Sequence, residues 1–237
     1  MVYGRIPLEL AMPKNKRNEA PASTASTRPG IYACGTDTVN SILKAALHIL
    51  IEEGAAAFTL RRIASECGLQ LGNVSRHFPR KEMLIQVLLE ELLEPSEGLV
   101  ERNIRKAGMS AEEALTLIIE GSLDEIKTKR MTRLFTELWA MANHNEVVAE
   151  RVKSLYHYVH QLIAEFVVQL NPKLSADDAY TVSLFISASI EGTTMLAGFG
   201  KPWRSLMPQL KGLATKSLIH LVKTVTPAEL QALTLKS

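Results

Sequence analysis

The chain has 237 residues, of which 46% are hydrophobic and only 5% aromatic, and its formal net charge is +2. This length allows one large domain or a small domain joined to a larger one, and an apolar content carried by Leu, Ala and Ile favours helices over sheet. The composition excludes a membrane span, since no apolar run approaches the roughly 18 residues required. It also excludes a disulfide framework and a zinc site, because Cys34 and Cys67 share no suitable spacing. A cytoplasmic protein without a metal or other cofactor is expected.

Residues 1–35 are predicted to form a flexible basic arm. The segment is rich in Ser, Thr, Pro and Ala, lacks apolar periodicity, and carries a net charge of +3 from five basic and two acidic side chains. A flexible basic segment of this kind suits contact with a polyanion such as the backbone of a nucleic acid.

Residues 36–95 are predicted to form a small helical head. Its first helix, over residues 38–53, shows apolar residues at helical spacing, with Asp37 or Thr38 as the N-cap and Gly54 at the end. A short second helix, residues 59–67, begins at Thr59.

A glycine turn separates the second helix from a third. Gly68 ends the second helix, the third runs from Leu71 to Phe78, and Pro79 closes it. A fourth helix, residues 80–94, stops before Pro95. A short helix, a glycine turn and another short helix make the helix-turn-helix pattern, whose second helix enters the major groove of DNA.

The third helix has two sides at about 100° per residue. Leu71, Val74 and Phe78 define the inward side. The outward side holds Gly72, Asn73, Arg76 and His77, with Ser75 near the inner edge. An exposed Arg or His alone is usually just solvated, so the prediction rests on the combination of motif, turn and local charge.

The outward residues suit double-stranded DNA. Asn73 can pair with adenine and Arg76 with guanine, and Gly72 allows the backbone to approach a phosphate closely. Thr59 and the start of its helix can hold a second phosphate. The segment from Thr59 to Lys81 carries a net charge of +4, because five basic side chains face one acidic one. The predicted DNA-binding residues are Thr59, Arg61, Arg62, Gly72, Asn73, Ser75, Arg76, His77 and Lys81.

The stretch TLRRIASECGLQLGNVSRHFPRKEML, residues 59–84, resembles the DNA-binding head of the TetR family of bacterial transcriptional regulators. The specific match covers about a quarter of the chain, and the helix over residues 38–54 fits as well. The matching features are Thr59, Ile63-Ala64, Gly68-Leu69, Gly72, His77-Phe78, Lys81-Glu82 and Leu84.

The resemblance implies a homodimer that binds a palindromic operator and is released by a small molecule. Repression is the family's commoner habit, and repressor versus activator stays open. One position departs from the family pattern, since many members carry Tyr where this chain has Ser75. That Tyr often contacts a phosphate, and Ser75 can still donate one hydrogen bond.

Residues 96–237 are predicted to form a larger helical body, so the predicted fold class is all-α. Ser110 and Glu113 form a capping box at the start of its first helix. The predicted helices are 110–127, 132–144, 145–170, 175–200 and 203–225. In the TetR resemblance, residues 134–166 look like the ligand-binding part, and the last two long helices look like the dimerisation pair.

Aromatic and sulfur side chains pair at four-residue spacing in this body. A pocket for a small apolar or amphipathic effector is predicted from Phe135, Trp139, Tyr156, His160, Met195 and Phe199. The alternative is that these residues are packed core. His144, His157 and His160 could bind metal in principle, but no carboxylate completes a site, so no metal is predicted.

Small residues in the helix around Phe185 allow another helix to approach closely. Two such helices from each subunit would make a four-helix interface across a two-fold axis. The predicted interface residues are Phe185, Ser189, Gly192, Leu210, Leu213, Ser217 and Leu221. Burial of these faces within one subunit is the alternative, and the family resemblance favours the dimer.

Two other functions were weighed against a ligand-responsive regulator. A helical-bundle metalloenzyme needs Glu-x-x-His sets on facing helices, and the chain contains none, so it is not expected to be an enzyme. A redox-sensing regulator could use Cys67, but that residue lies on the apolar face of its helix, where a buried inert thiol is expected.

Overall fold

The computed structural model describes residues 30–93 and 99–234, and within these ranges every regular element is helical. The predicted all-α class is confirmed. The head comprises α1 (Gly30–Glu52), the 3-10 helix η2 (Ala55–Ala57), α2 (Leu60–Glu66), α3 (Leu71–His77) and α4 (Lys81–Leu93). The body comprises α5 (Leu99–Ala107), α6 (Ala111–Glu125), α7 (Lys129–Ala142), α8 (Glu146–Leu170), α9 (Ala176–Ala197), η3 (Arg204–Leu206), α10 (Met207–Thr224) and α11 (Pro227–Thr234).

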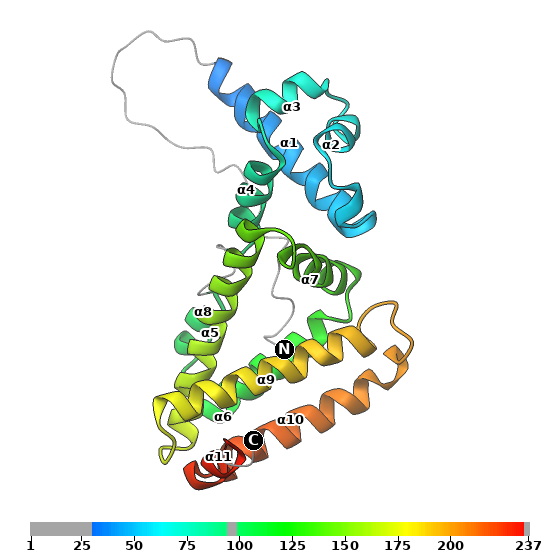
Figure 1. Ribbon diagram of the computed structural model, residues 1–237. Helices are drawn as coiled ribbons and strands as arrows, with labels where there is room; N and C mark the ends of the chain where they lie inside the picture. Colours follow the sequence, from blue (N-terminus) through cyan, green and yellow to red (C-terminus); the bar gives the residue numbers. More distant parts are fainter. Residues whose placement is uncertain (1–29, 94–98, 235–237) are drawn as a thin grey trace, which may run out of the picture.

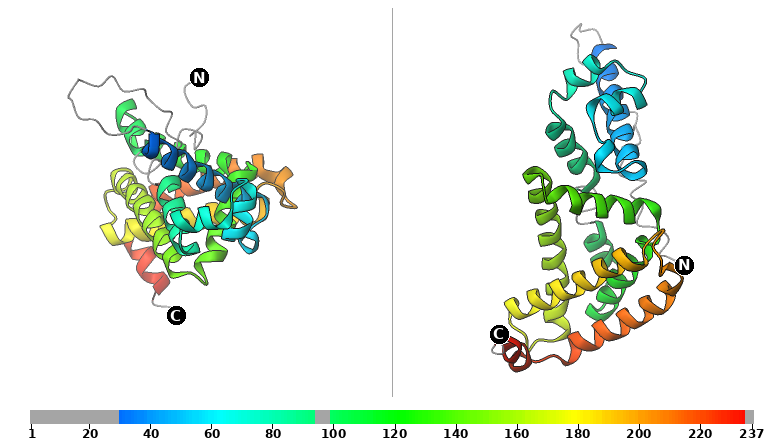
Figure 2. Two further views of the ribbon diagram at one scale, coloured as in Figure 1. Left: turned by 90° about the horizontal axis from the view of Figure 1, so that it is seen from above. Right: turned by 45° about the vertical axis from the view of Figure 1, so that its right-hand side comes forward.

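The molecule is elongated, with the head at one end (Figure 1). Helices α1, α2 and α3 lie at the end of the head, and α4, its last helix, runs from them toward the body. Helices α9 and α10 lie side by side at the far end, and α7 lies between them and the head (Figures 1 and 2). The body meets the head through α7, which contacts α1 and η2, and through α8, which contacts α4.

The predicted caps and turns of the head are largely confirmed. The Thr59 hydroxyl oxygen accepts a hydrogen bond from the Arg62 backbone N–H at 3.1 Å, which starts α2. Gly54 and Gly68 have φ angles of 84° and 67°, a left-handed conformation that glycine adopts without strain. The glycine turn therefore sets the angle between α2 and α3.

The body helices begin at local sequence signals. The predicted capping box of α6 is present, because Glu113 and Ser110 satisfy each other's backbone N–H groups. Ser175 and Asp178 form a second capping box at α9. Asn145 caps α8 through its side-chain oxygen.

The start of the first helix differs from prediction. Helix α1 begins at Gly30, so Asp37 and Thr38 lie inside it and do not cap it. Such residues sit in helices at little cost, so a capping residue type does not by itself fix a helix start. The predicted arm therefore overlaps α1 from residue 30, and residues 1–29 lie outside the described residues.

Two short helices were not predicted. Helix α5 was missed because it is only nine residues long and, among its described side chains, only Ile104 is deeply buried. A segment this short shows no detectable apolar periodicity. Helix α11 has a readable signal that the prediction overlooked. Thr226 and Glu229 cap its start reciprocally, and Pro227 occupies the first helical position.

The hydrophobic core does not divide where the sequence suggests a boundary, at residue 95. One cluster contains side chains of all four head helices and of two body helices. The body contributes Leu134, Leu138 and Met141 of α7 and Val148 and Val152 of α8. A second cluster joins the remainder of α8 to α5, α6, α9 and α10. Helix α7 thus belongs to the body in sequence and to the head in packing.

Among the described helices, none is both long enough and apolar enough to cross a lipid bilayer.

Candidate nucleic-acid interface and ligand pocket

Helix α3 has one face buried in the head and one face exposed to solvent. Val74 and Phe78 are buried against the head core, whereas Gly72, Asn73 and Arg76 are exposed. Ser75 and His77 are half-buried at the edges of the exposed face. The outward face predicted from helical geometry is therefore present, and its polar side chains are free to meet a groove.

Leu71 does not lie where its periodicity predicts. Its side chain is 40% exposed, although it was expected to join Val74 and Phe78 on the inward side. Leu71 is the first residue of α3, and no preceding helical turn directs its side chain toward the core. It adds an apolar group to the exposed N-terminal end of α3.

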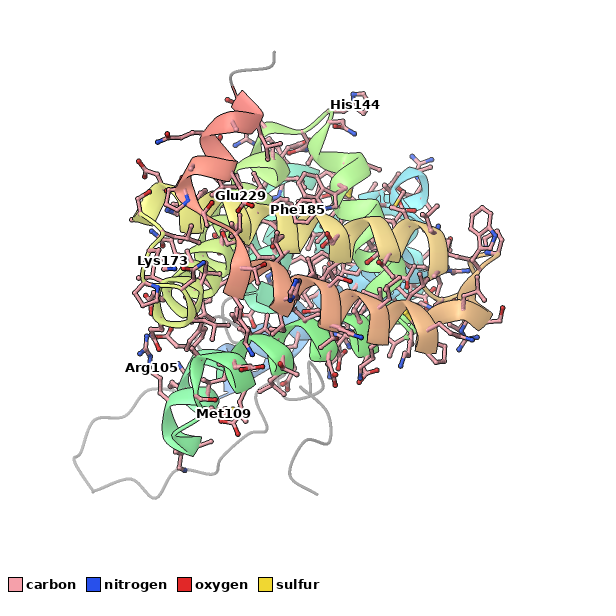
Figure 3. The ribbon with its side chains drawn as sticks, turned by 90° about the horizontal axis from the view of Figure 1, so that it is seen from below. Arg105, Met109, His144, Lys173, Phe185 and Glu229 are labelled. Carbon is pink, nitrogen blue, oxygen red and sulfur yellow. The ribbon has the colours of Figure 1, made fainter. Side chains whose placement is uncertain are left out.

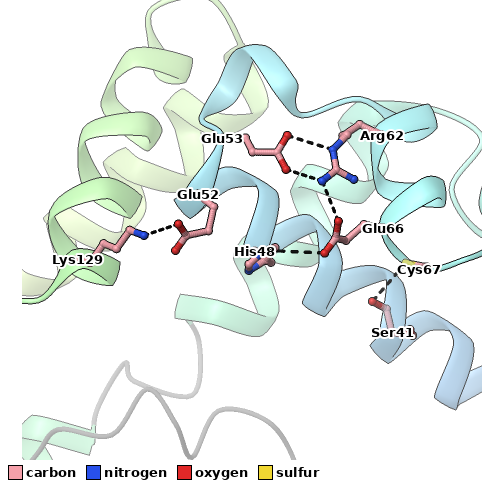
Figure 4. A network of polar contacts seen from close by, with 8 residues as sticks. All are labelled: Ser41, His48, Glu52, Glu53, Arg62, Glu66, Cys67 and Lys129. Atoms are coloured by element: carbon pink, nitrogen blue, oxygen red, sulfur yellow. Dashed lines mark hydrogen bonds and ion pairs between the residues drawn. The ribbon is translucent and has the colours of Figure 1, made fainter.

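Arg62 is engaged within the protein (Figure 4). Its Nε donates to Glu53 Oε2 at 3.0 Å, and its Nη2 donates to Glu53 Oε1 and, at 2.8 Å, to Glu66. These two carboxylates raise the pKa of Arg62 above its usual range. These contacts hold α2 against the end of α1. They leave only the Nη1 group of Arg62 available for the predicted contact with DNA.

The remaining basic residues of the head differ in their surroundings. Arg61, Arg76 and Arg80 are exposed, and none forms an ion pair with a residue that the structure describes. The Lys81 ammonium lies 5.8 Å from the centre of the buried Phe58 ring, at the start of α4. Thr59 is exposed beside Arg61. Arg61, Arg76 and Arg80 are thus exposed on the head without an ion-pair partner among the described residues.

A pocket of about 450 Å³ opens between α7 and α9. This size lies within the range of small-molecule sites, roughly 300–1,000 Å³. Its lining residues are Thr136, Trp139, Ala140 and Asn143 from α7 and Glu191, Gly192 and Met195 from α9. Of the six predicted pocket residues, Trp139 and Met195 line it.

A hydrogen-bonded chain runs behind the pocket wall. The Trp139 indole N–H donates to the Tyr156 hydroxyl oxygen at 3.2 Å, and the Tyr156 hydroxyl donates to Glu191. The Trp139 and Tyr156 rings are 5.2 Å apart. Burial raises the pKa of Glu191, opposed by the hydrogen bond from Tyr156. Burial, and then the charge of Glu191, raises the pKa of Tyr156.

The other predicted pocket residues lie outside this lining. The His160 ring packs 5.8 Å behind Tyr156, and burial lowers the pKa of His160. Phe199 lies under the Arg204 guanidinium, 5.0 Å from ring centre to carbon. Phe135 is half-buried elsewhere on α7. Spacing along one helix placed these residues on common faces but could not show which face meets the pocket.

Glu191 was not identified from the sequence. A signal was available, since Glu191 is the only charged residue between Asp178 and Lys201. A lone carboxylate on a helix of small and apolar residues is costly to bury without a partner. Thr136 and Asn143 gave no comparable signal.

Helix α9 exposes several large apolar side chains, and α10 exposes one. Phe185 is 56% exposed on α9, and Leu213 is exposed on α10. Figure 3 views this end of the body from below, with Phe185 labelled. The other exposed large apolar residues here are Leu184, Met195, Leu196, Trp203 and Leu206. Exposed large apolar side chains in this number favour an interaction surface on α9.

The predicted interface residues divide into two groups. Phe185, Gly192, Leu213 and Ser217 are exposed. Leu210 and Leu221 are half-buried against the core of their own subunit, and the Ser189 hydroxyl donates to the Phe185 carbonyl. The half-buried pair contributes mainly to the subunit itself.

Cys67 is partly buried, and its thiol donates to the Ser41 carbonyl at 3.6 Å. Burial raises the pKa of Cys67, which disfavours the reactive thiolate. No group of three His, Cys, Asp or Glu side chains that could hold a metal ion occurs among the residues described.

Two family profiles match separate parts of the chain. Residues 42–88 match the profile described as bacterial regulatory proteins of the tetR family. Residues 111–210 match the profile described as the C-terminal part of BetI-type transcriptional repressors. The first match contains the helix-turn-helix, and the second contains both walls of the pocket.

Relatives and solved structures agree with these profiles. A helix-turn-helix transcriptional regulator from the dhlA 5′ region of Xanthobacter autotrophicus is 27% identical over 66% of this chain and 77% of its own length. The regulator BetI of Escherichia coli is 23% identical over 68% of this chain and 83% of its own. A regulator from Saccharomonospora viridis, solved in complex with choline, superposes with a TM-score of 0.64 at 20% identity, over 78% and 97% of the chains. A TetR-family regulator from Streptomyces coelicolor superposes with a TM-score of 0.66 at 16% identity, over 80% of this chain and 97% of its own.

Proposed function

Since the chain belongs to the TetR family of bacterial transcriptional regulators and is a DNA-binding regulator, we propose that it represses transcription as a homodimer on a palindromic operator and is released by a small cationic effector. It would act in the cytoplasm. The observation that carries the DNA-binding part is the exposed Gly72–Asn73–Arg76 face of α3, fixed from beneath by Val74 and Phe78.

Selection of bound duplexes from a random pool tests this proposal. The expected result is one sequence with two inverted half-sites, whose centres are separated by about 34–36 Å or a multiple of that distance. A transcription assay on the selected operator should then show lower output when the protein is added. Recovery of unrelated duplexes with no inverted repeat would contradict the proposal.

Gly72→Ala separates folding from DNA contact. A Cβ at Gly72 meets no atom within 4 Å, so the free protein should gain about 0.5–1 kcal/mol of stability from lost chain flexibility. Operator affinity should fall by about 1–3 kcal/mol, the worth of a hydrogen bond to a charged group, because the methyl separates backbone from phosphate. Thermal denaturation and fluorescence anisotropy measure the two effects.

Gly121→Ala in α6 is the matched control, since a Cβ there also meets nothing within 4 Å. It should leave operator affinity unchanged. If Gly72→Ala also left it unchanged, the close approach of α3 to a phosphate would be refuted.

The pocket chemistry supports a cationic effector. Trp139 supplies an aromatic ring, and Glu191 supplies a carboxylate whose ionised form is disfavoured by burial. A cation would stack on the Trp139 ring and pair with that carboxylate. The choline found in the Saccharomonospora viridis regulator is a ligand of this chemical class. The predicted apolar or amphipathic effector thus gains a positive charge.

Choline and its neutral isostere 3,3-dimethylbutan-1-ol test the charge. The native protein should bind choline at least about ten-fold more tightly than the isostere, because cation–π attraction contributes about 0.5–2 kcal/mol and the carboxylate adds to it. Glu191→Gln should reduce this preference while keeping the shape of the pocket. Calorimetric titration measures all four affinities, and equal binding of both compounds by the native protein would exclude a cationic effector.

The affinity for choline should also depend on pH. Burial raises the pKa of Glu191 above its ordinary value, so the free protein keeps a proton there to a higher pH than an exposed Glu does. A bound cation favours the ionised carboxylate, and binding therefore releases that proton. Choline affinity should rise with pH up to the raised pKa and then level off. Glu191→Gln should abolish the rise.

A further inference from the structure

Helix α7 contributes to both the head and the pocket. Its residues Leu134, Leu138 and Met141 are buried in the core cluster that contains α1, α2 and α3. Its residues Trp139 and Ala140 line the pocket, with Thr136 and Asn143. These two sets lie on different faces of one helix, so a displacement of α7 caused at the pocket is felt in the head core.

Three charged residues of α7, spaced four apart, hold the end of α1 and the turn that follows it. Lys129 pairs with Glu52, and the Arg133 Nη1 group donates to the backbone carbonyls of Ile51 and Glu52 at 3.1 and 3.2 Å. The Glu137 carboxylate accepts from the Ala55 backbone N–H at 2.8 Å. We name Lys129, Arg133 and Glu137 the α7 clamp.

The clamp reaches the DNA-binding helices through the same turn. A Cβ at Gly54 would lie 3.2 Å from Glu137, so Glu137 is seated directly against the turn. Residue 59, the N-cap of α2, follows this turn after four residues. Beside it, Glu53 at the end of α1 pairs with Arg62 of α2 (Figure 4). The position of α2, and of α3 packed on it, thus depends on where α7 holds the turn.

We propose that the α7 clamp positions the helix-turn-helix and transmits occupancy of the pocket to it, with Glu137 as the central contact. This inference rests on the proposal that the pocket is the effector site. It gives the signal a path through α7 and the end of α1, in addition to the connection that α4 makes between head and body.

The physical strength of the clamp lies in Glu137 more than in the ion pairs. Exposed ion pairs such as Lys129–Glu52 contribute little individually because water screens them. The Glu137 bond is partly buried and charge-assisted, so its loss leaves a backbone donor without a partner. Glu137→Ala should therefore disconnect the turn, whereas Glu137→Gln retains an acceptor oxygen.

A thermodynamic cycle without any ligand tests the path. Ala140→Trp places a large side chain in the pocket and imitates occupancy. In the otherwise native protein it should weaken operator binding about five-fold or more, as allosteric ligands commonly do. In the Glu137→Ala background the same substitution should weaken binding less than about two-fold, and Glu137→Gln should restore most of the effect.

The controls distinguish a signal path from a purely structural role. If Glu137 only stabilises the head, Glu137→Ala lowers operator affinity but leaves the factor caused by Ala140→Trp unchanged, which overturns the proposal. No effect of Ala140→Trp in the native protein also overturns it. Lys153→Ala, which removes an exposed ion pair with Glu150 on α8, should leave the factor intact.

Circular dichroism establishes that each variant is folded. Arg133→Ala replaces Glu137→Ala if the latter unfolds, and should likewise reduce the factor caused by Ala140→Trp. Because the cycle uses no effector, a protein that fails to bind choline still gives a readable result. Failure of the effector proposal is thus distinguished from failure of the clamp.

Discussion

Phe185→Asp is expected to convert the proposed dimer into monomers at concentrations where the native protein pairs. Phe185 is 56% exposed on α9, beside the exposed Leu184. Burying a Phe side chain contributes about 1.5–3 kcal/mol, and an unpaired carboxylate buried there adds a penalty of several kcal/mol. The dimer dissociation constant should therefore rise about 1,000-fold or more. Sedimentation velocity measures this change directly.

Operator affinity should fall with dimer loss, because two linked heads bind two half-sites far more tightly than one head binds one. Val147→Asp is the matched control. It replaces an exposed apolar residue in the first turn of α8, where a negative charge suits the helix dipole. If Phe185→Asp sedimented as the native dimer, the α9 face would not be the interface.

Arg76→Ala is expected to change what the protein reads as well as how tightly it binds. Arg76 is exposed on α3, and it forms no ion pair with any residue that the structure describes. A bidentate contact from Arg to guanine is worth about 1–3 kcal/mol of discrimination. Repeating the duplex selection with this variant should show lost preference at one position of each half-site.

Arg61→Ala provides the comparison, since Arg61 is exposed and predicted to hold a phosphate. It should weaken all sequences alike and lower the slope of log affinity against log salt by about one unit. An unchanged preference with Arg76→Ala would show that Arg76 does not read a base.

The head could be predicted because its determinants are local. Thr59, Gly68 and the spacing of Val74 and Phe78 specify a cap, a turn and a buried side within one short stretch, and all are present. Leu71 escaped the same reasoning because a first helical residue lacks a preceding turn to direct it.

The rest of the candidate sites depends on residues that are distant in sequence. Glu191 accepts a hydrogen bond from Tyr156, 35 positions away, and Glu137 accepts one from a backbone N–H group 82 positions away. Helical periodicity shows that a residue faces inward but does not identify its partner. Arg62 is instructive for the same reason, because its exposed, basic position resembled a DNA contact until Glu53 and Glu66 were placed beside it.

The shared core of α1–α4 and α7 limits how the protein can be cut and recombined. A head excised at residue 95 would lose the contacts of Leu134, Leu138, Met141, Val148 and Val152, and would leave apolar surface in water. Chimeras that graft the DNA specificity of this protein onto another regulator must therefore carry α7 and the first turns of α8, or rebuild their contacts. The unit that evolution can exchange intact is larger than the helix-turn-helix itself.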